Sequence, residues 1–445
     1  MMGSERRMCG RWLLLGLLSC VCAAQGATRY DADGVLSARL ETERWYINRA
    51  RFEPEREADF YGLTNTTSGG HPDYDCCEDS TGANDFGTST NDWAPWKVSK
   101  GPLAPNLLLH TAASNHCRDM AEQDAFQHAS PSSNYYSLND DPDDRHAKEG
   151  YTNLITGYYE NIAWGMLAGW SSYPPFGRAP EDVHDGLYVD ATASTRGHRK
   201  AILNDSALEI GLGHFQTNLM RYYGDPYFHD FFCTDDYDTQ DFGRRTDHFF
   251  TGTIFHDADA NGVYTNGEGV GDIEIRLWDD GQEGQWYDVS EPSGSFAVPI
   301  NDHADGHEID VALVNKSGSS QSLTVPLSWG NLGELELTNN ETYIVGSYVQ
   351  PAGLTNIGFR NLTPRFENAV SLNGTNISIR FNSLGRVTYR IESNDQHLTN
   401  ASAWVEFDSL TATNGQAEFV DTGQGGRPAP PDATNRFYRV LLERE

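Results

Sequence analysis

The chain has 445 residues, with 64 acidic against 32 basic side chains and a formal net charge of −32. This length exceeds one ordinary hydrophobic core, so we expect two to four domains. A surface this acidic repels phosphate backbones and anionic membranes, which excludes nucleic acid as the expected partner.

The first 26 residues have the pattern of a secretion signal. Basic residues up to Arg11 precede an apolar run from Trp12 to Cys22, which is too short to cross a bilayer. Small residues follow, so we expect cleavage near residue 26 and a secreted protein. The alternative is a lipoprotein signal that anchors the chain at Cys20. We expect no transmembrane segment, because no later stretch has the ~20 apolar residues of a membrane-spanning helix.

Cleavage at this position leaves four cysteines, which are Cys76, Cys77, Cys117 and Cys233. Four cysteines in an exported protein are typical of two disulfides. Because Cys76 and Cys77 are adjacent, the expected arrangement joins them separately to Cys117 and Cys233. The alternatives are free thiols and a bond within the adjacent pair.

Helical periodicity dominates the first half of the mature chain, and two short apolar runs follow it. The predicted helices cover residues 36–52, 107–126 and 183–203, and the predicted strands cover residues 210–215 and 227–233. Residues 62–92 and 130–150 are polar and are predicted as loops. Helices followed by a strand pair favour a three-layered α/β/α domain over a helical bundle.

His128, Glu160 and His198 lie in three separate segments, each in or next to an apolar-patterned element. Two imidazoles and a carboxylate are a donor set that Zn²⁺ or another divalent cation takes, with one coordination position left open. The structural alternative is that Glu160 accepts backbone hydrogen bonds and that His198 orients a loop. No serine or cysteine lies in an activated nucleophile motif.

Five short motifs surround these residues in a fixed order. They are Gln127-His128-Ala129, Glu160-Asn161-Ile162-Ala163, Val189-Asp190-Ala191, Gly197-His198-Arg199 and Ile210-Gly211-Leu212-Gly213. As a set, the motifs resemble the CAP superfamily of cysteine-rich secretory proteins, antigen 5 and pathogenesis-related 1 proteins. The resemblance covers residues 36–235 and implies an α/β/α sandwich with a cleft tetrad of two histidines and two glutamates. Three of the tetrad places match, but Thr195 stands where many members have the second glutamate.

A second chemical motif lies at residues 257–268, which match the twelve-residue calcium loop. The expected oxygen donors are Asp257, Asp259, Asn261, the backbone carbonyl of Val263, and Glu268. Gly262 allows the sharp turn at the sixth position. The flanking residues alternate as strands do, so the motif is not an EF-hand. The alternative is an Asp/Asn/Gly turn without a metal.

Short alternating runs replace helical periodicity after residue 235 and predict all-β domains at residues 247–350 and 365–445. The runs at residues 252–255 and 271–277 flank the calcium motif, and with it they resemble the SdrD B-like repeats of bacterial surface proteins. Those repeats are β-sandwiches that a loop calcium rigidifies. The last segment resembles an Ig/fibronectin-like β-sandwich of exported bacterial proteins. We expect Tyr389, Trp404 and Tyr438 to pack its core.

Together these features predict a multidomain, monomeric, secreted bacterial CAP-domain protein with a structural Ca²⁺ in its first β-module. The family is linked to lipid and sterol binding, so the resemblance implies a small hydrophobic or cell-surface ligand in the cleft. The first alternative is a metal-dependent extracellular hydrolase, a peptidase, that uses His128, Glu160 and His198. The second alternative is an adhesion or envelope-interaction protein that acts through its β-modules. We expect a binding protein rather than an enzyme.

Overall fold

The structure is a computed structural model, and it describes thirteen ranges of the chain. They are residues 36–63, 94–155, 159–169, 178–190, 196–221, 231–279, 282–328, 331–363, 370–373, 376–395, 403–413, 415–423 and 436–443. The signal-like N-terminus, Cys76, Cys77 and Thr195 lie outside these ranges. None of the helices in the described ranges is long and apolar enough to cross a membrane.

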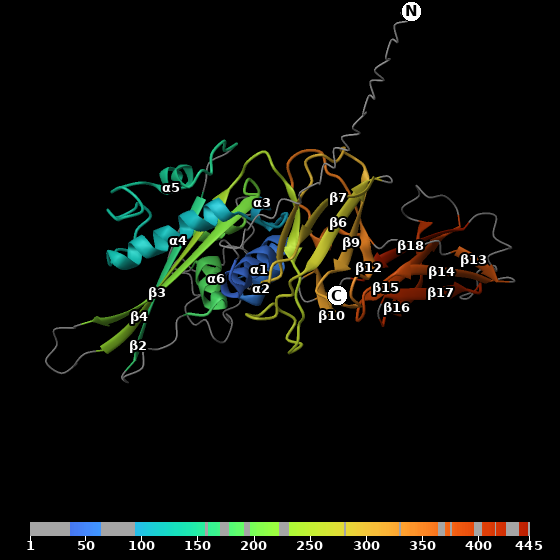
Figure 1. Ribbon diagram of the computed structural model, residues 1–445. Helices are drawn as coiled ribbons and strands as arrows, with labels where there is room; N and C mark the ends of the chain where they lie inside the picture. The colour runs from blue at the N-terminus through green and yellow to red at the C-terminus, as the bar shows by residue number, and fades with distance from the viewer. Residues whose placement is uncertain are drawn as a thin grey trace, which may run out of the picture.

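The first part of the chain combines helices with a mixed sheet (Figure 1). Its helices are α1 (Ala38–Phe52), α2 (Pro54–Phe60), α3 (Ala94–Lys97), α4 (Leu107–Glu122), α5 (Pro142–Lys148), α6 (Pro180–Val189) and α7 (Gly197–Ile202). Its strands are β1 (Ala104–Pro105), β2 (Tyr159–Gly169), β3 (Glu209–Arg221) and β4 (Phe231–Gly243). The sheet order is β1-β3-β4-β2, so β2, which carries Glu160, is an edge strand.

Consecutive residues of β3 contact different helices. A Cβ atom on Gly211 or Gly213 would collide with the backbone of α4, so these glycines permit the close approach of helix and strand. Ile210 and Leu212 belong instead to an apolar cluster with residues of α1 and α6. Strand geometry explains the difference, because successive side chains point to opposite faces of a sheet.

Three predicted elements differ from the structure. The predicted helix at 183–203 is divided, because Asp190 ends α6 in the left-handed conformation (φ 52°) and α7 begins at Gly197. The predicted strand at 227–233 begins at Phe231 and continues to Gly243, so the sheet extends past residue 235. The predicted loop at 130–150 contains helix α5, which Asp141 and Pro142 begin as N-cap and first residue.

The rest of the chain is rich in strands, which form several separate sheets. The strands up to residue 349 are β5 (Phe249–Thr253), β6 (Ile273–Asp279), β7 (Gln282–Val289), β8 (Ser295–Pro299), β9 (Glu308–Asn315), β10 (Gln321–Ser328), β11 (Asn331–Leu337) and β12 (Thr342–Val349). A short 3-10 helix, η2 (Phe359–Asn361), follows. The last strands are β13 (Val370–Asn373), β14 (Asn376–Asn382), β15 (Thr388–Asn394), β16 (Val405–Thr411), β17 (Gln416–Asp421) and β18 (Phe437–Leu442). The described sheets here are β12-β9-β6-β7, β10-β11, β5-β8, β13-β14-β17 and β16-β15-β18.

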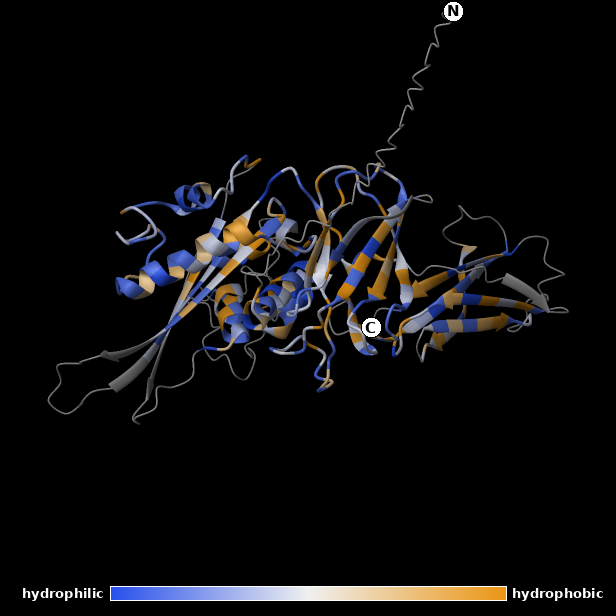
Figure 2. Ribbon diagram, viewed as in Figure 1, coloured by the Kyte–Doolittle hydropathy of each residue, from blue (hydrophilic) through white to orange (hydrophobic). Residues whose placement is uncertain are grey.

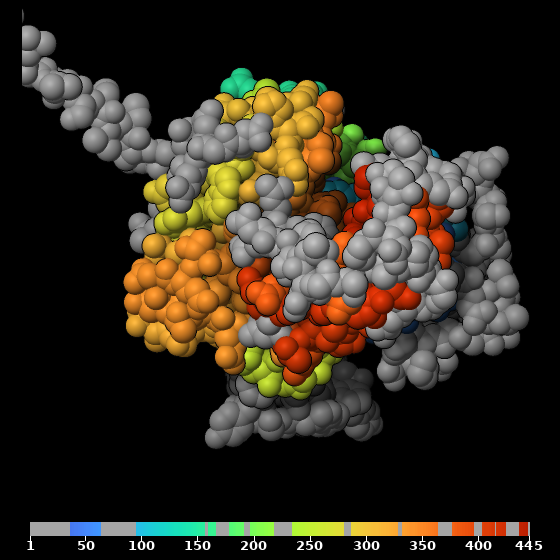
Figure 3. Space-filling view, turned by 90° about the vertical axis from the view of Figure 1, so that its right-hand side faces the viewer, coloured from blue at the N-terminus to red at the C-terminus, as the bar shows by residue number. Residues whose placement is uncertain are grey.

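One apolar cluster runs through both strand-rich regions, from Phe250 to Val440. Alternate residues of β6 are buried, and its hydrophobic and hydrophilic residues alternate in Figure 2. The Tyr343 hydroxyl donates to the carbonyls of Ser383 (2.6 Å) and Gly415 (2.8 Å), so the two regions are in direct contact. Figure 3 views this end of the molecule, with the red C-terminal strands beside the orange residues that precede them.

The core residues expected for the last segment are largely as predicted. Tyr389 is buried within the apolar cluster, and Tyr438 packs against it. Trp404 is half-buried, with the Arg439 guanidinium 4.5 Å from its ring centroid. These contacts give the three aromatic side chains a packing role.

Buried polar contacts join the first part of the chain to β5. Arg44 of α1 donates to the carbonyl of Gly252 (2.7 Å) and forms an ion pair with Glu41 (2.5 Å). The Thr253 hydroxyl donates to the same carboxylate at 2.5 Å. Arg44, Glu41 and Thr253 are buried, so separating the two parts would deprive both charged groups of the hydrogen-bond partners that β5 supplies.

Candidate functional site

The Glu160 carboxylate is the centre of a polar cluster on edge strand β2. Its side chain is buried, and Oε1 lies 2.9 Å from Nδ1 of His128. Oε2 accepts a hydrogen bond from Nη2 of Arg145 and lies 3.9 Å from Nε2 of His116. Both carboxylate oxygens therefore already have cationic or ionisable partners.

Arg145 and His116 are members of this cluster that the sequence did not single out. Arg145 comes from α5 and also donates to the backbone carbonyl of His128 at 2.8 Å, so it fixes both the carboxylate and the loop. His116 comes from α4 and contacts the carbonyl of Gln127 at 3.1 Å. Burial lowers the pKa of His116 to about 4, although Glu160 opposes the shift. The Arg145 guanidinium thus provides the permanent countercharge of Glu160.

His198 lies in a second histidine–carboxylate pair. Its Nδ1 is 2.8 Å from Oδ1 of Asp190, and its backbone N–H donates to Oδ2 at 3.0 Å. Asp190 is buried, and its left-handed conformation at the end of α6 aims the carboxylate at the start of α7. The carbonyl of His198 accepts a hydrogen bond from Asn161 of β2 at 3.2 Å.

Both histidines contact β2, because Glu160 contacts the His128 ring and Asn161 donates to the backbone carbonyl of His198. The side chains of His128 and His198 are 53% and 31% exposed, while their carboxylate partners are buried. With Nδ1 held by a carboxylate, Nε2 is the ring atom left for a ligand. This orientation is typical of metal-binding histidines.

Within the ranges that the structure describes, one group of three or more potential ligands has its donor atoms within 4.8 Å of one another, and it consists of Asp257, Asp259 and Glu268. His128, Glu160 and His198 do not form such a group. Because Glu160 is held by Arg145, the donors that fit a cation at the cleft are the two imidazoles. Zinc binding at the cleft stays a prediction.

An exposed aromatic pair adjoins His128. Phe126 precedes this histidine by two residues, and Trp164 lies on the same face of β2 as Glu160. The two ring centroids are 6.4 Å apart, and the residues are 49% and 41% exposed. An apolar surface beside hydrogen-bonding groups is characteristic of small-molecule sites.

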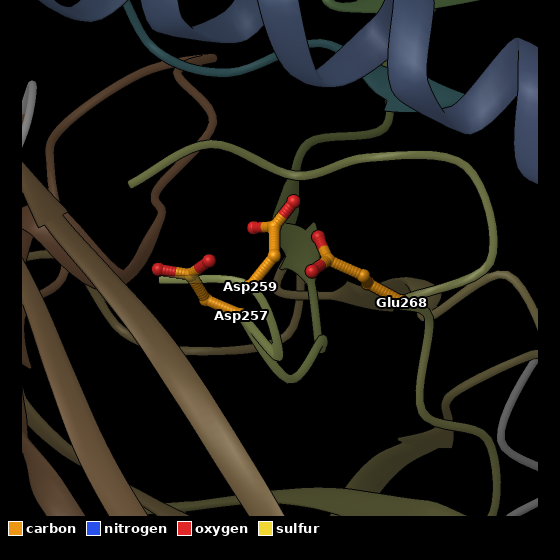
Figure 4. Close-up of side chains that lie close together, drawn as sticks. All are labelled: Asp257, Asp259 and Glu268. Atoms are coloured by element: carbon orange, nitrogen blue, oxygen red, sulfur yellow. The ribbon is translucent and has the colours of Figure 1, made fainter. Parts of the chain in front are cut away.

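The predicted calcium loop brings its acidic side chains together, as Figure 4 shows for Asp257, Asp259 and Glu268. Asp257 accepts hydrogen bonds from the amides of Asn261 (3.0 Å) and Gly262 (3.1 Å). Gly262 has a φ of +82°, which glycine adopts without strain.

The remaining loop contacts also orient oxygen atoms. Glu268 accepts from the amides of Ala258 (3.0 Å) and Thr265 (2.8 Å), so the twelfth position is fixed against both halves of the loop. The Asn261 side chain donates to Asp259 (3.0 Å) and accepts from the amide of Val263 (2.8 Å). The carboxylates fit a hard cation such as Ca²⁺, and calcium binding stays a prediction.

The calcium loop packs against the first helix of the chain. Tyr264, in the eighth position of the loop, is buried in a cluster with Trp45 and Tyr46 of α1 and with Phe255. Val263 packs against the same cluster. The loop is therefore part of the contact between α1 and the strand-rich region.

The disulfide predicted at Cys117 is absent. Its thiol is free and buried, and Sγ lies 3.1 Å from the Thr239 hydroxyl. Burial raises the pKa of this thiol, which opposes formation of the reactive thiolate. Cys76, Cys77 and the side chain of Cys233 lie outside the described residues, so the other predicted bridge stays a prediction.

The order of helices and strands and the two histidine–carboxylate pairs define an α-and-β domain with a polar cluster near its edge strand. Residues 97–234 match the model of the "Cysteine-rich secretory protein family", CAP. This part of the chain is a CAP domain.

Among solved structures, the chain is similar to an extracellular protein containing a SCP domain from Bacillus anthracis str. Ames. The sequences are 22% identical with a TM-score of 0.20, and the match covers 33% of this chain and 35% of that protein. The chain thus spans about a third of that protein's length. A comparison with curated proteins found no matching sequence.

Proposed function

We propose that the protein is an extracellular CAP-domain protein that binds a small molecule with an apolar body and a polar head, such as a lipid or sterol, beside β2. The observation that carries this proposal is the exposed pair of Phe126 and Trp164 next to His128. Covering the exposed parts of both rings would remove about 190 Å² from water, which contributes about 4 to 5 kcal/mol before the costs of association.

The polar groups of the cleft support the same ligand class. The ring of His128 is half exposed and is held by Glu160, so its outward nitrogen is available to a hydroxyl or carboxyl head group. Glu160 is paired with Arg145 and does not repel such a head group as a free carboxylate would. The export signal expected in the first 26 residues supports an extracellular site of action.

The experiment is native mass spectrometry of the exported protein. We expect a bound small molecule on the wild-type protein, and its loss in Trp164→Ala. Phe60→Ala is the matched control, because Phe60 is an aromatic residue of similar exposure (44%) on a different element, α2. A protein that carries no ligand, or the same ligand load in both variants, would contradict the proposal.

The alternative function is that of a metal-dependent hydrolase, and the two carboxylate-held histidines favour it. Cation binding would use the outward nitrogens of His128 and His198, and a metal there would activate water. Calorimetric titration with Zn²⁺ in saturating Ca²⁺ tests this alternative. Binding lost in both His128→Ala and His198→Ala would support it, and unchanged binding would retire it.

A further inference from the structure

A cavity of about 330 Å³ lies between the helical part of the chain and residues 354–356, which follow β12. Its walls come from four separate segments, which are the end of α1 at Arg51, residues 95–101, residues 205–208 and residues 354–356. A volume of this size is within the range of small-molecule sites. The cavity does not include the cleft residues His128, Glu160 and His198.

Buried hydrogen bonds hold the cavity walls in place. The Asn356 side chain accepts from the amide of Phe249 (2.9 Å) and donates to the carbonyls of Pro102 (2.7 Å) and Leu208 (2.6 Å). A Cβ atom on Gly101 would collide with the carbonyl of Asn356, so the two backbones are in direct contact. Hydrogen bonds and backbone contact therefore fix the walls that the helical part of the chain and residues 354–356 contribute to the cavity.

Two buried cations line this cavity. Arg51 donates to the carbonyls of Gly101 (2.9 Å), Ile202 (2.7 Å), Asn204 (2.8 Å) and Ala207 (3.3 Å). Nζ of Lys100 donates to the carbonyls of Pro95 (2.7 Å) and Val98 (2.6 Å). Their partners are thus neutral backbone groups, and both side chains are more than nine-tenths buried.

The lack of a direct ion pair with a described carboxylate distinguishes Arg51 from the other buried arginines of α1. Arg44 is paired with Glu41, and Arg49 with Glu57. In the described part of the chain, no carboxylate lies within 4.0 Å of the Arg51 or Lys100 nitrogens. Such an arrangement costs free energy, because carbonyl dipoles replace only part of the hydration of an ion.

The two cations also act on each other. Burial lowers the pKa of Lys100, the charge of Arg51 lowers it further, and Asp205 opposes these effects. Burial likewise lowers the pKa of Arg51, again with Asp205 as the opposing charge. A second negative charge in the cavity would relieve this repulsion.

We propose that this cavity binds a small oxyanion, a carboxylate or a phosphate group, between Lys100 and Arg51. Leu208 and Leu354 provide an apolar wall for a short hydrocarbon part. The anion would contact both the helical part of the chain and residues 354–356, since both contribute to the cavity walls. The proposal is independent of the ligand proposed for the cleft.

The test is calorimetric titration of the full-length mature protein with inorganic phosphate and, separately, with pentanoate. Sodium chloride at matched ionic strength is the control for screening. Lys100→Gln removes one cation, while Arg51 is kept because it holds four backbone carbonyls. Lys97→Gln is the matched control, since Lys97 belongs to the same segment but pairs with Glu55 (3.4 Å).

We expect binding of at least one probe that Lys100→Gln weakens on the order of tenfold or more, the usual effect of losing a charged hydrogen bond. Asp205→Asn should strengthen binding, because it removes the competing carboxylate, and Lys97→Gln should leave it unchanged. Phosphate alone would identify an inorganic oxyanion, and pentanoate an organic acid. Three results would overturn the proposal. They are no binding of either probe, binding as tight to Lys100→Gln as to the wild-type protein (an adventitious ion only), and an equal loss of binding in Lys97→Gln.

Discussion

Removal of calcium from the loop at 257–268 should destabilise both the strand-rich region and helix α1, which packs against the loop. The perturbation is Glu268→Gln, which keeps the shape of the side chain and removes one carboxylate. Glu268 receives amides from both halves of the loop, at Ala258 and Thr265, so it closes the ring of expected ligands. Without a cation, the acidic oxygens within 4.8 Å of one another repel.

The magnitude follows from linkage. At a calcium concentration about 100 times Kd, binding to the folded state adds about 2.7 kcal/mol. For a cooperative unit of about 150 to 250 residues, this corresponds to a rise of about 5 to 10 °C in Tm. Helix α1 should share the rise, because Tyr264 of the loop is buried against Trp45 and Tyr46 of this helix.

Scanning calorimetry with calcium and with chelator measures this rise, and hydrogen exchange of the α1 amides shows whether this helix shares the stabilisation. The matched control is Glu336→Gln, which removes an exposed carboxylate from β11 of the same region. A rise in Tm that persists in Glu268→Gln would refute the calcium site. If Glu268→Gln abolishes the calcium-dependent rise in Tm but calcium does not change the hydrogen exchange of α1, only the coupling between the loop and α1 is refuted.

Three further substitutions test the packing. Arg44→Ala leaves Glu41 as a buried charge without its ion-pair partner. Denaturant titration should show that the free energy of unfolding falls by about 3 to 5 kcal/mol. A fall of less than about 1 kcal/mol would contradict a stabilising role of the ion pair. Burial raises the pKa of Glu43 to about 8. The folded state then binds more protons than the unfolded state, so this residue's contribution to stability falls as pH rises from about 4.5 to 8. Glu43→Gln should remove this decline, which is on the order of 5 kcal/mol, in urea titrations at both ends of the pH range. A decline as steep as that of the wild-type protein would contradict the raised pKa. Gly213→Ala places a Cβ against the backbone of Ala113 and should cost about 1 to 3 kcal/mol by thermal unfolding, whereas a neutral substitution would mean that α4 is free to move away.

Local sequence spacing predicted the parts of the sites that lie close together in the chain. The calcium motif spans twelve residues, and Asp257, Asp259 and Glu268 meet as their spacing indicates. The pairing of His128 with Glu160 joins two elements, and the CAP resemblance placed both residues in one cleft. These agreements follow from turn geometry and from family motifs.

Long-range partners and backbone conformation were not accessible in the same way. Arg145 lies in a polar stretch whose role depends on the distant Glu160, so it had no local signal. Asp190 adopts a left-handed conformation that divides a continuous helical pattern, and helical periodicity does not report that break. Cys117 shows the same limit, because cysteine number predicts pairing without the distances that decide it.

The most direct test of ligand binding by the CAP domain is a titration of the mature protein with a fluorescent fatty acid and a fluorescent sterol. We expect saturable binding of at least one probe to the wild-type protein and to Phe60→Ala. Trp164→Ala and Phe126→Ala should each weaken it on the order of tenfold, because each removes half of the exposed aromatic pair. Equal binding by all four proteins, or binding by none of them, would contradict the account.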